Sequence, residues 1–417
     1  MLSTILISFG NFFINYHLSQ ELEVILYGEF SLIFSTIALI VPLILLGQPV
    51  SITSIYFSDE KKGCNNVAVE MSISYKIMLF AFLVVSVVTL SIWKWGFEEQ
   101  YAFSFVSLFL LSVLAYAFYT YFLNIVVIFD RYKIYFSVAL LSTAVLIANI
   151  VFNPSIEGYF FGLIASSLIL ILVGLYLHKE NKALELKSSI FPTKELLMLG
   201  WAAIPGMMIS TLNSYIDRYA INYFLDLEKV AYYSLAATLG VGIGNVLITS
   251  LLKGSSISML QSLQENKVAK YLKVQKNILT LLFSLAFISV VLYELLGADI
   301  ILLIFSEKYR LSIEYIMPLF LIIVLNGIAT LYAQPLVQKK KLYVLLYISI
   351  FVVVINIVLN ILLIQTLGVK GVIVAMFFAT LVNLYYVFHY SKKNFIWLKF
   401  PYLPVAIISI LEIWSLV

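Results

Sequence analysis

Apolar runs of about 20 residues recur along this chain of 417 residues, and they restrict its fold more than any other feature. Each run is long enough to cross a hydrocarbon layer of about 30 Å as an α-helix. Apolar residues form 62% of the chain and charged residues only 12%, which is too little charge to cover a soluble domain. The runs also lack the alternating pattern and Gly/Asn turns of an outer-membrane barrel. The sequence therefore predicts an all-α integral membrane protein.

The apolar runs predict about 12 transmembrane helices. The expected spans are 2–18, 28–47, 73–93, 101–129, 134–152, 158–177, 197–224, 230–252, 276–297, 313–337, 343–364 and 371–390. A further apolar stretch at 400–417 contains two prolines and Glu412, and it predicts either a thirteenth span or an interfacial helix. The longest loops are expected at 178–195 and 253–275.

The positive charges alternate between loops, as expected if lysine and arginine collect on the cytoplasmic side. With a cytoplasmic N-terminus, the inner loops hold 19 of the 26 lysines and arginines, and the outer loops hold five. The five outer residues are Lys94, Lys229, Lys308, Arg310 and Lys370. We therefore expect a multi-pass protein of the cell inner (plasma) membrane with its N-terminus in the cytoplasm.

The chain also repeats itself at an offset of 207 residues. The segment 14–18 matches 221–225, and the segment 149–153 matches 356–360. Two blocks that share one offset indicate a duplication, and six helices in each half place both halves in the membrane with the same orientation. Such repeats are related by a pseudo-two-fold axis along the membrane normal, with the substrate path between them.

The duplication predicts the domain organisation. We expect an N-terminal six-helix bundle at 1–178, a cytoplasmic linker at 179–196 and a C-terminal six-helix bundle at 197–391, followed by a tail or extra helix at 392–417. Helix seven begins about thirteen residues before Ser210, whereas helix one has only two residues before the matching Ser3. We therefore expect either that the inner half of helix one is missing or that the true start lies upstream, and we favour an incomplete start.

Helix seven carries the most informative polar residues. Ser210, Asn213, Ser214 and Asp217 follow helical spacing and share one face, and Arg218 comes next. Charged groups inside a span persist when they are paired or face water. One interpretation is a cavity in which Arg218 binds a phosphate or acidic sugar and Asp217 orients it or carries a coupling proton. The other is an ion pair, mutual or between helices, that fixes packing, and the sequence leaves both open.

Two further helices carry polar stripes that suit a hydrated cavity. Asn245 lies on a stripe in helix eight, and Asn11 lies on one in helix one. The stripe residues are Thr238, Gly242, Asn245 and Thr249 in helix eight, and Ser8, Asn11 and Asn15 in helix one. Hydrogen bonding between closely packed helices is the simpler explanation for each single residue. The pairs Asn149/Asn153 and Asn356/Asn360 predict such packing contacts.

No enzyme signature is present in the sequence. We find no phosphate-binding glycine loop and no HExxH motif, and the three histidines form no metal set. We therefore expect no enzyme activity, no catalytic residue, no metal, no cofactor and no nucleic-acid partner. Energy would come from proton or sodium coupling or from the substrate gradient.

Several loose motifs together resemble a known family, the Wzx-type polysaccharide flippases. They are Pro205 with the Asp217-Arg218 pair, the Tyr233-Ser234 step, and the run from Asn356 followed by 367–371. The resemblance spans nearly the whole chain and implies the multidrug/oligosaccharidyl-lipid/polysaccharide exporter fold. It implies a lipid-linked oligosaccharide substrate, namely undecaprenyl-diphosphate-linked O-antigen or capsule units, with membrane lipids and the polysaccharide polymerase machinery as partners. Gln365 and the shortened helix one depart from the family pattern.

Three other functions compete with this interpretation. An ion-coupled multidrug antiporter of the same fold would need an acidic site without a basic partner, and Arg218 beside Asp217 argues against it. An O-antigen polymerase would be expected to carry a long charged outer loop, whereas all expected outer loops are short. A scaffolding protein would not need the duplicated polar stripes.

Overall fold

The computed structural model describes residues 2–51, 65–96, 101–128, 132–182, 193–265, 267–339, 341–395, 399 and 401–416. These residues are almost entirely helical, as expected for backbone that must satisfy its own hydrogen bonds in lipid. The elements are α1 (Leu2–Glu21), α2 (Val24–Leu45), α4 (Asn65–Gly96), α5 (Phe103–Ile128), α6 (Tyr132–Phe152), α7 (Ile156–Lys182), α8 (Thr193–Phe224), α9 (Leu227–Gln264), α10 (Val268–Ile304), the 3-10 turn η1 (Glu307–Ser312), α11 (Ile313–Gln338), α12 (Leu342–Leu367), α13 (Val369–Asn394) and α14 (Tyr402–Leu416). Positions 183–192 of the predicted linker lie outside the described residues.

Each of the 12 expected spans falls on one helix, which confirms the all-α membrane fold. Nine of the helices found in the described ranges are long and apolar enough to cross a membrane. These nine do not include α1, α6 and α8, and a shorter apolar stretch, Phe136–Phe152, lies in α6. The last helix, α14, has 15 residues and spans about 22 Å, which is shorter than a hydrocarbon core of about 30 Å.

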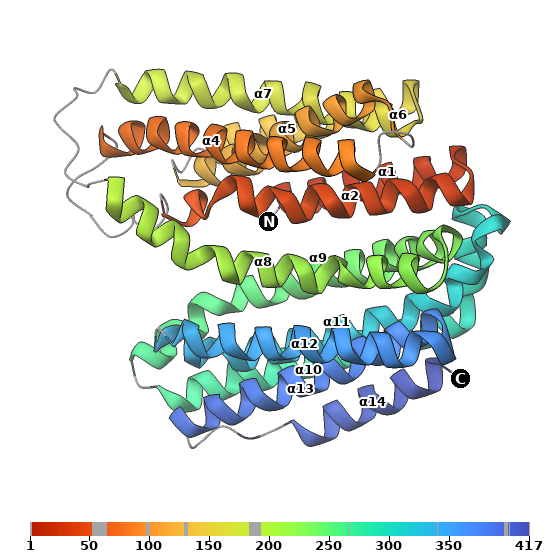
Figure 1. Ribbon diagram of the computed structural model, residues 1–417. Coiled ribbons are helices and arrows are strands. Elements are labelled where there is room, and N and C mark those ends of the chain that lie inside the picture. The colour runs from red at the N-terminus through yellow and green to blue at the C-terminus, as the bar shows by residue number, and fades with distance from the viewer. Residues whose placement is uncertain are drawn as a thin grey trace. The chain divides into compact units, whose positions relative to one another are not determined.

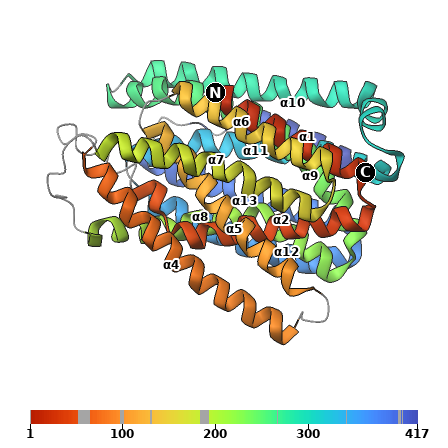
Figure 2. The same ribbon diagram turned by 90° about the horizontal axis from the view of Figure 1, so that it is seen from above.

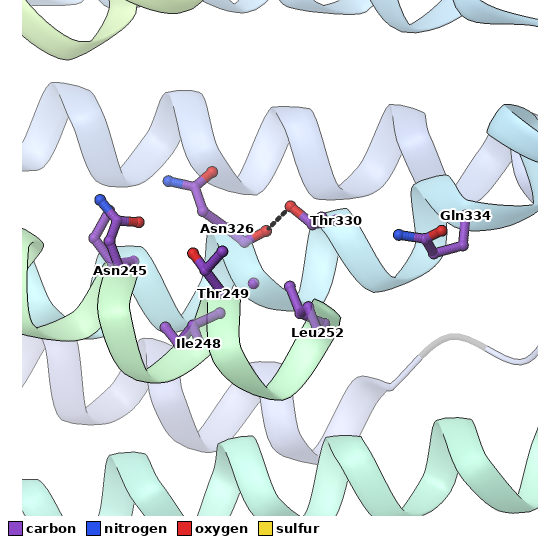
Figure 3. A pocket seen from close by; sticks show the side chains of 9 residues that line it. Asn245, Ile248, Thr249, Leu252, Asn326, Thr330 and Gln334 are labelled. Carbon is purple, nitrogen blue, oxygen red and sulfur yellow. Dashed lines mark hydrogen bonds between the residues drawn. The ribbon is translucent and has the colours of Figure 1, made fainter. Parts of the chain in front are cut away.

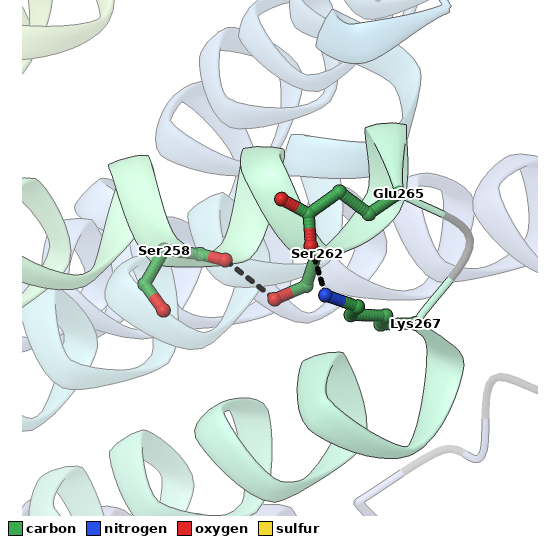
Figure 4. Close-up of polar contacts among 4 residues, drawn as sticks. All are labelled: Ser258, Ser262, Glu265 and Lys267. Atoms are coloured by element: carbon green, nitrogen blue, oxygen red, sulfur yellow. Dashed lines mark hydrogen bonds and ion pairs between the residues drawn. The ribbon is translucent and has the colours of Figure 1, made fainter.

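The predicted loop at 253–275 is wrong, because helix continues through most of it. α9 runs to Gln264 and α10 begins at Val268 (Figure 4). Lysine, glutamine and glutamate are good helix formers, so their charge marks the end of the apolar span without ending the helix. The tight turn between the two helices is held by an ion pair of 2.7 Å between Lys267 and Glu265 and by a backbone bond from the Lys267 amide to Ser262.

The helices form two compact units. One comprises Ser19–Leu32 and Leu212–Val417, and the other comprises Leu2–Leu18 and Ile33–Thr211. The domain boundaries expected from the duplication, at 178 and 197, stay a prediction.

In the first unit, α11 is the central helix. It contacts α9, α10, α12, α13 and α14, and Figure 1 shows it among the green and blue helices of this unit. Of its apolar span 83% is buried, against 22% for the neighbouring span α12. A helix that is apolar on all sides is stable only where neighbours surround it, and α12 keeps a broad face for lipid. Gly368, with a φ of +60°, makes the tight connection from α12 to α13.

In the second unit, α7 contacts α4, α5 and α6, and Figure 2 shows these helices from above. Phe160 of α7 is fully buried, and its ring packs edge-on against Phe109 of α5 at a centroid distance of 6.2 Å. Several buried serines of this unit donate back to their own helix, as Ser167 does to the Leu163 carbonyl at 2.7 Å, whereas Ser74 donates to the Gln48 side chain at 2.9 Å. Their polarity is therefore satisfied without a bound partner.

Candidate functional site

Asp217 of α8 is buried in the first unit and is held by three side chains. It is 1% exposed. The Tyr233 hydroxyl donates to its Oδ2 at 3.0 Å, and the amides of Asn356 and Asn360 donate to its Oδ1 at 3.2 and 2.8 Å. Hydrogen bonds to a charged acceptor are among the stronger ones in proteins. This Asp217 network joins α8 to α9 and α12.

The backbone places these donors by simple spacing. Asn356 and Asn360 are four residues apart, so their amides lie one above the other on α12 and reach the same carboxylate oxygen. The predicted packing role of this pair is confirmed, although its partner was not foreseen. The amide oxygens Asn356 Oδ1 and Asn360 Oδ1 are buried and have no hydrogen-bond partner within the part of the chain that the structure describes.

Arg218 follows Asp217 but turns to a different set of groups. Its Nε donates to the Ser234 hydroxyl at 3.0 Å, and the guanidinium carbon lies 5.0 Å from the centre of the Tyr215 ring. Ser234 also accepts a bond of 2.6 Å from Ser31 of α2. The side chain is half-buried, so part of the guanidinium stays open.

The two neighbouring charges are therefore held separately. Consecutive residues point about 100° apart on a helix, which directs Asp217 to α12 and Arg218 to Ser234. Within the described residues Arg218 makes no ion pair, so the mutual ion pair considered as the alternative is not formed. The partners of the guanidinium are neutral, and its positive charge is not cancelled by a bound carboxylate.

The repeat-related positions in the second unit carry no such network. The position equivalent to Asp217 is Gly10, where an added Cβ would lie 2.2 Å from the Thr143 side chain. The amide of Asn149, equivalent to Asn356, donates to the Val145 carbonyl of its own helix at 3.0 Å. Among the described residues, the Asp217 network is thus found in the unit that contains Leu212–Val417, and its repeat counterpart is not found in the other unit.

Asn245 lies in a different place, at a groove between α9 and α11 that has a volume of about 280 Å³ (Figure 3). We call it the amide groove. Its polar lining residues are Asn245, Thr249, Asn326, Thr330 and Gln334. Asn245 lies 12 residues beyond Tyr233 on α9, about 18 Å along the helix axis from the Asp217 network. The predicted site therefore divides into two sites in the same unit.

The other predicted residues have less defined surroundings. Asn213 is half-buried and Ser214 is exposed on α8, and the Ser214 carbonyl lies 3.5 Å from the Arg218 guanidinium. Ser210 and Asn11 belong to the other compact unit, and the Asn11 carbonyl accepts a bond of 2.8 Å from Asn15. A single cavity that joins all the predicted residues stays a prediction.

Several residues of the two sites were not predicted from the sequence. Asn326, Thr330 and Gln334 repeat every four residues within an apolar span, and this spacing could have identified a polar face on α11. Ser31 gave no such signal, because it meets Ser234 only through the packing of α2 on α9. Among the described residues, no three His, Cys, Asp or Glu side chains gather where they could hold a metal ion.

Comparison with solved structures places this fold among membrane transporters. An inward-facing multidrug resistance MATE family transporter of the MOP superfamily is 17% identical, with a TM-score of 0.68 over 97% of this chain and 95% of that one. The lipid II flippase MurJ in an inward closed conformation is 15% identical, with a TM-score of 0.69 over 100% and 96%. A MOP superfamily transporter from Pyrococcus furiosus is 16% identical, with a TM-score of 0.63 over 98% and 96%.

The chain is accordingly a multi-pass membrane protein with the fold of MOP-superfamily transporters. The structures that share this fold are described as transporters or flippases and not as enzymes. No protein-family model and no curated protein sequence matches the chain.

Proposed function

We propose that this protein is a flippase that moves undecaprenyl-diphosphate-linked O-antigen or capsule repeat units from the cytoplasmic to the periplasmic leaflet by alternating access. The sugar diphosphate headgroup needs a polar path, while the polyprenyl tail remains in lipid. The fold shared with a lipid II flippase supports this class of substrate. The proposal places the protein in the inner membrane with its N-terminus in the cytoplasm, delivering its product to polysaccharide polymerase machinery.

One observation carries the proposal: within the described residues Arg218 makes no ion pair, although the sequence predicts that its helix crosses the membrane. A charge in a span is costly and is retained where it serves a function. Ser234 and Tyr215 fix the guanidinium without neutralising it. A diphosphate offers acceptor oxygens that a guanidinium binds through paired hydrogen bonds. Arg218 would therefore bind the diphosphate of the headgroup.

Asp217 supports ion coupling of the same transport cycle. The buried oxygens of Asn356 and Asn360 have no partner among the described residues, and each unmet acceptor costs about 1–3 kcal/mol. Rotation of either amide by half a turn would present its oxygen, beside the Asp217 carboxylate, to a cation. Carboxylate and amide oxygens are ligands that hard cations prefer, and a proton on the carboxylate would serve equally. The network would thus bind the coupling proton or sodium ion.

The same observation favours a second candidate, an ion-coupled multidrug antiporter. A buried carboxylate suits cation exchange, and the fold is shared with a multidrug resistance transporter. The two candidates differ at Arg218, because a guanidinium repels organic cations and attracts diphosphates.

The test measures flipping of a fluorescent polyprenyl diphosphate sugar by the full chain in proteoliposomes. Arg218→Ala should slow flipping at least tenfold. Arg218→Lys should retain part of the rate, because it keeps the charge but loses the Nε bond to Ser234. Arg310→Ala is the matched control, since Arg310 is exposed and pairs with Glu307 in η1. Wild-type flipping by Arg218→Ala would reject the role of Arg218, and uptake of an organic cation with no lipid flipping would favour the antiporter.

A further inference from the structure

The amide groove is built from polar faces on two neighbouring helices. Asn245 and Thr249 are four residues apart on α9, and Asn326, Thr330 and Gln334 repeat at the same interval on α11. Ile248 and Ile323 form apolar walls, and the missing side chain at Gly327 lets Ile248 approach α11. Figure 3 shows the polar side chains following one another along the groove.

Most of these polar side chains have no hydrogen-bond partner among the residues that the structure describes. The Thr330 hydroxyl donates to the Asn326 carbonyl at 2.9 Å. Across the described ranges, the side chains of Asn245, Thr249, Asn326 and Gln334 make no hydrogen bond. Both helices belong to spans that are apolar enough to cross the membrane. Hydrocarbon cannot hydrogen-bond amides, so the groove must hold water or a polar ligand.

The chemistry of the lining selects a neutral ligand rich in hydroxyl groups. None of the described side chains that line the groove is charged. Amides and hydroxyls each provide both donors and acceptors, and a sugar hydroxyl likewise donates and accepts. The volume of about 280 Å³ lies just below the roughly 300–1,000 Å³ range of drug-sized ligand sites. The groove therefore suits about one sugar ring, and its described lining has no charged side chain to pair with a phosphate.

The groove also lies on the same face of α9 as the partner of Arg218. Ser234, the partner of Arg218, and Asn245 are 11 residues apart on α9, which is three helical turns and returns to the same face. Thr238 lies on that face between them and donates to the Ser234 carbonyl at 2.9 Å. The distance along the axis is about 16 Å. One face of α9 thus connects a cationic group to a neutral polar groove.

We infer that the amide groove binds a neutral sugar ring, which makes it a sugar-recognition site separate from the diphosphate contact at Arg218. This inference rests on the proposed function, since the sugar would belong to the headgroup of a lipid-linked substrate. Under this arrangement the groove discriminates among sugars, while Arg218 binds the diphosphate common to all of them.

A binding experiment tests the groove without transport. The purified full chain is heated with and without free neutral hexoses, their N-acetylamino forms and glucuronic acid. A ligand that binds only the folded state raises the unfolding midpoint. At least one neutral sugar should raise the unfolding midpoint. Asn245→Leu and Thr249→Val should each weaken the binding of that sugar at least tenfold. Asn277→Leu, at an exposed asparagine on α10 outside the groove, should leave the response unchanged. No response in the wild type, or a wild-type response in both groove variants, overturns the inference.

Flipping in proteoliposomes separates the groove from the proposed function. A polyprenyl diphosphate with a neutral sugar is compared with the bare polyprenyl diphosphate. The groove variants should flip the sugar-bearing lipid at least tenfold more slowly than Asn277→Leu does, and the bare lipid at an equal rate. Equal flipping of both lipids by all variants overturns the inference and leaves the flippase intact. Sugar binding that depends on the groove, with no flipping of either lipid by the wild type, overturns the proposed function and leaves the groove intact.

Discussion

The side-chain amide of Asn360 donates a hydrogen bond of 2.8 Å to the carboxylate of Asp217, across 143 residues of sequence. This bond joins α12 to α8 inside one compact unit. It also explains why Asp217 and Arg218, although adjacent, form no ion pair among the described residues. The carboxylate accepts from neutral donors, and the guanidinium donates to the hydroxyl of Ser234.

The Asp217 network should contribute strongly to stability. Asp217→Leu leaves the hydroxyl of Tyr233 and the amides of Asn356 and Asn360 without their acceptor, which should lower the free energy of unfolding by about 3 kcal/mol or more. Asn360→Leu should cost less, because two donors still reach the carboxylate. The effects should be less than additive in the double variant, since both changes break the same bond. Denaturant unfolding in detergent measures this, and strictly additive losses would show that the residues act independently.

Asp217 should also set the ion dependence of transport. Asp217→Asn removes the charge while keeping nearly the same shape, so transport should lose its response to an imposed proton or sodium gradient. The control is Glu228→Gln, since Glu228 is an exposed acid at the start of α9 that bonds the Tyr232 hydroxyl. Flipping is measured in proteoliposomes with each gradient applied separately. A gradient response that survives in Asp217→Asn would place the coupling site elsewhere.

The sequence predicted the membrane spans well because the solvent dictates them. Any segment that crosses hydrocarbon must be apolar and must satisfy its own backbone, so composition and length reveal it locally. The ends of α9 and α10 were wrong for the same reason, since the apolar pattern marks the edge of the lipid and not the end of the helix. α14 is a helix of 15 residues, and it packs against α10 and α11.

The candidate sites were predictable only in part. Helical spacing identified Asp217 and Asn245 on their own helices, because side chains three or four residues apart share a face. It could not show that Asn356 and Asn360 meet Asp217, or that Asn326 lies opposite Thr249. Those contacts depend on how the helices rotate and pack, which each helix alone does not encode.

The turn between α9 and α10 gives a pH prediction outside the membrane. The hydrogen bond and charge of Lys267 hold the pKa of Glu265 below its usual value. A lowered pKa means that this contact favours the folded state above the ordinary pKa of glutamate and is lost as pH falls through the lowered value. Lys267→Ala should raise the pKa of Glu265 towards normal, and Lys270→Ala should raise it less, because its charge is the weakest of these influences. A carboxyl titration followed by nuclear magnetic resonance measures both shifts. Equal shifts would show that the ion pair does not form in solution.

The close approach of α9 and α11 at Gly240 should tolerate no side chain. A Cβ at Gly240 would lie 2.5 Å from the Ile316 carbonyl oxygen, whereas a Cβ at Gly242 would meet nothing within 4 Å. Gly240→Ala should therefore push the two helices apart and cost about 1–3 kcal/mol. Gly242→Ala should stabilise the protein by up to about 1 kcal/mol, because alanine favours helix over glycine. Unfolding midpoints of the two variants should move in opposite directions. A shift of the same sign in both would mean that α9 and α11 are not in backbone contact at Gly240. That result would contradict the packing of α9 on α11 that forms the amide groove.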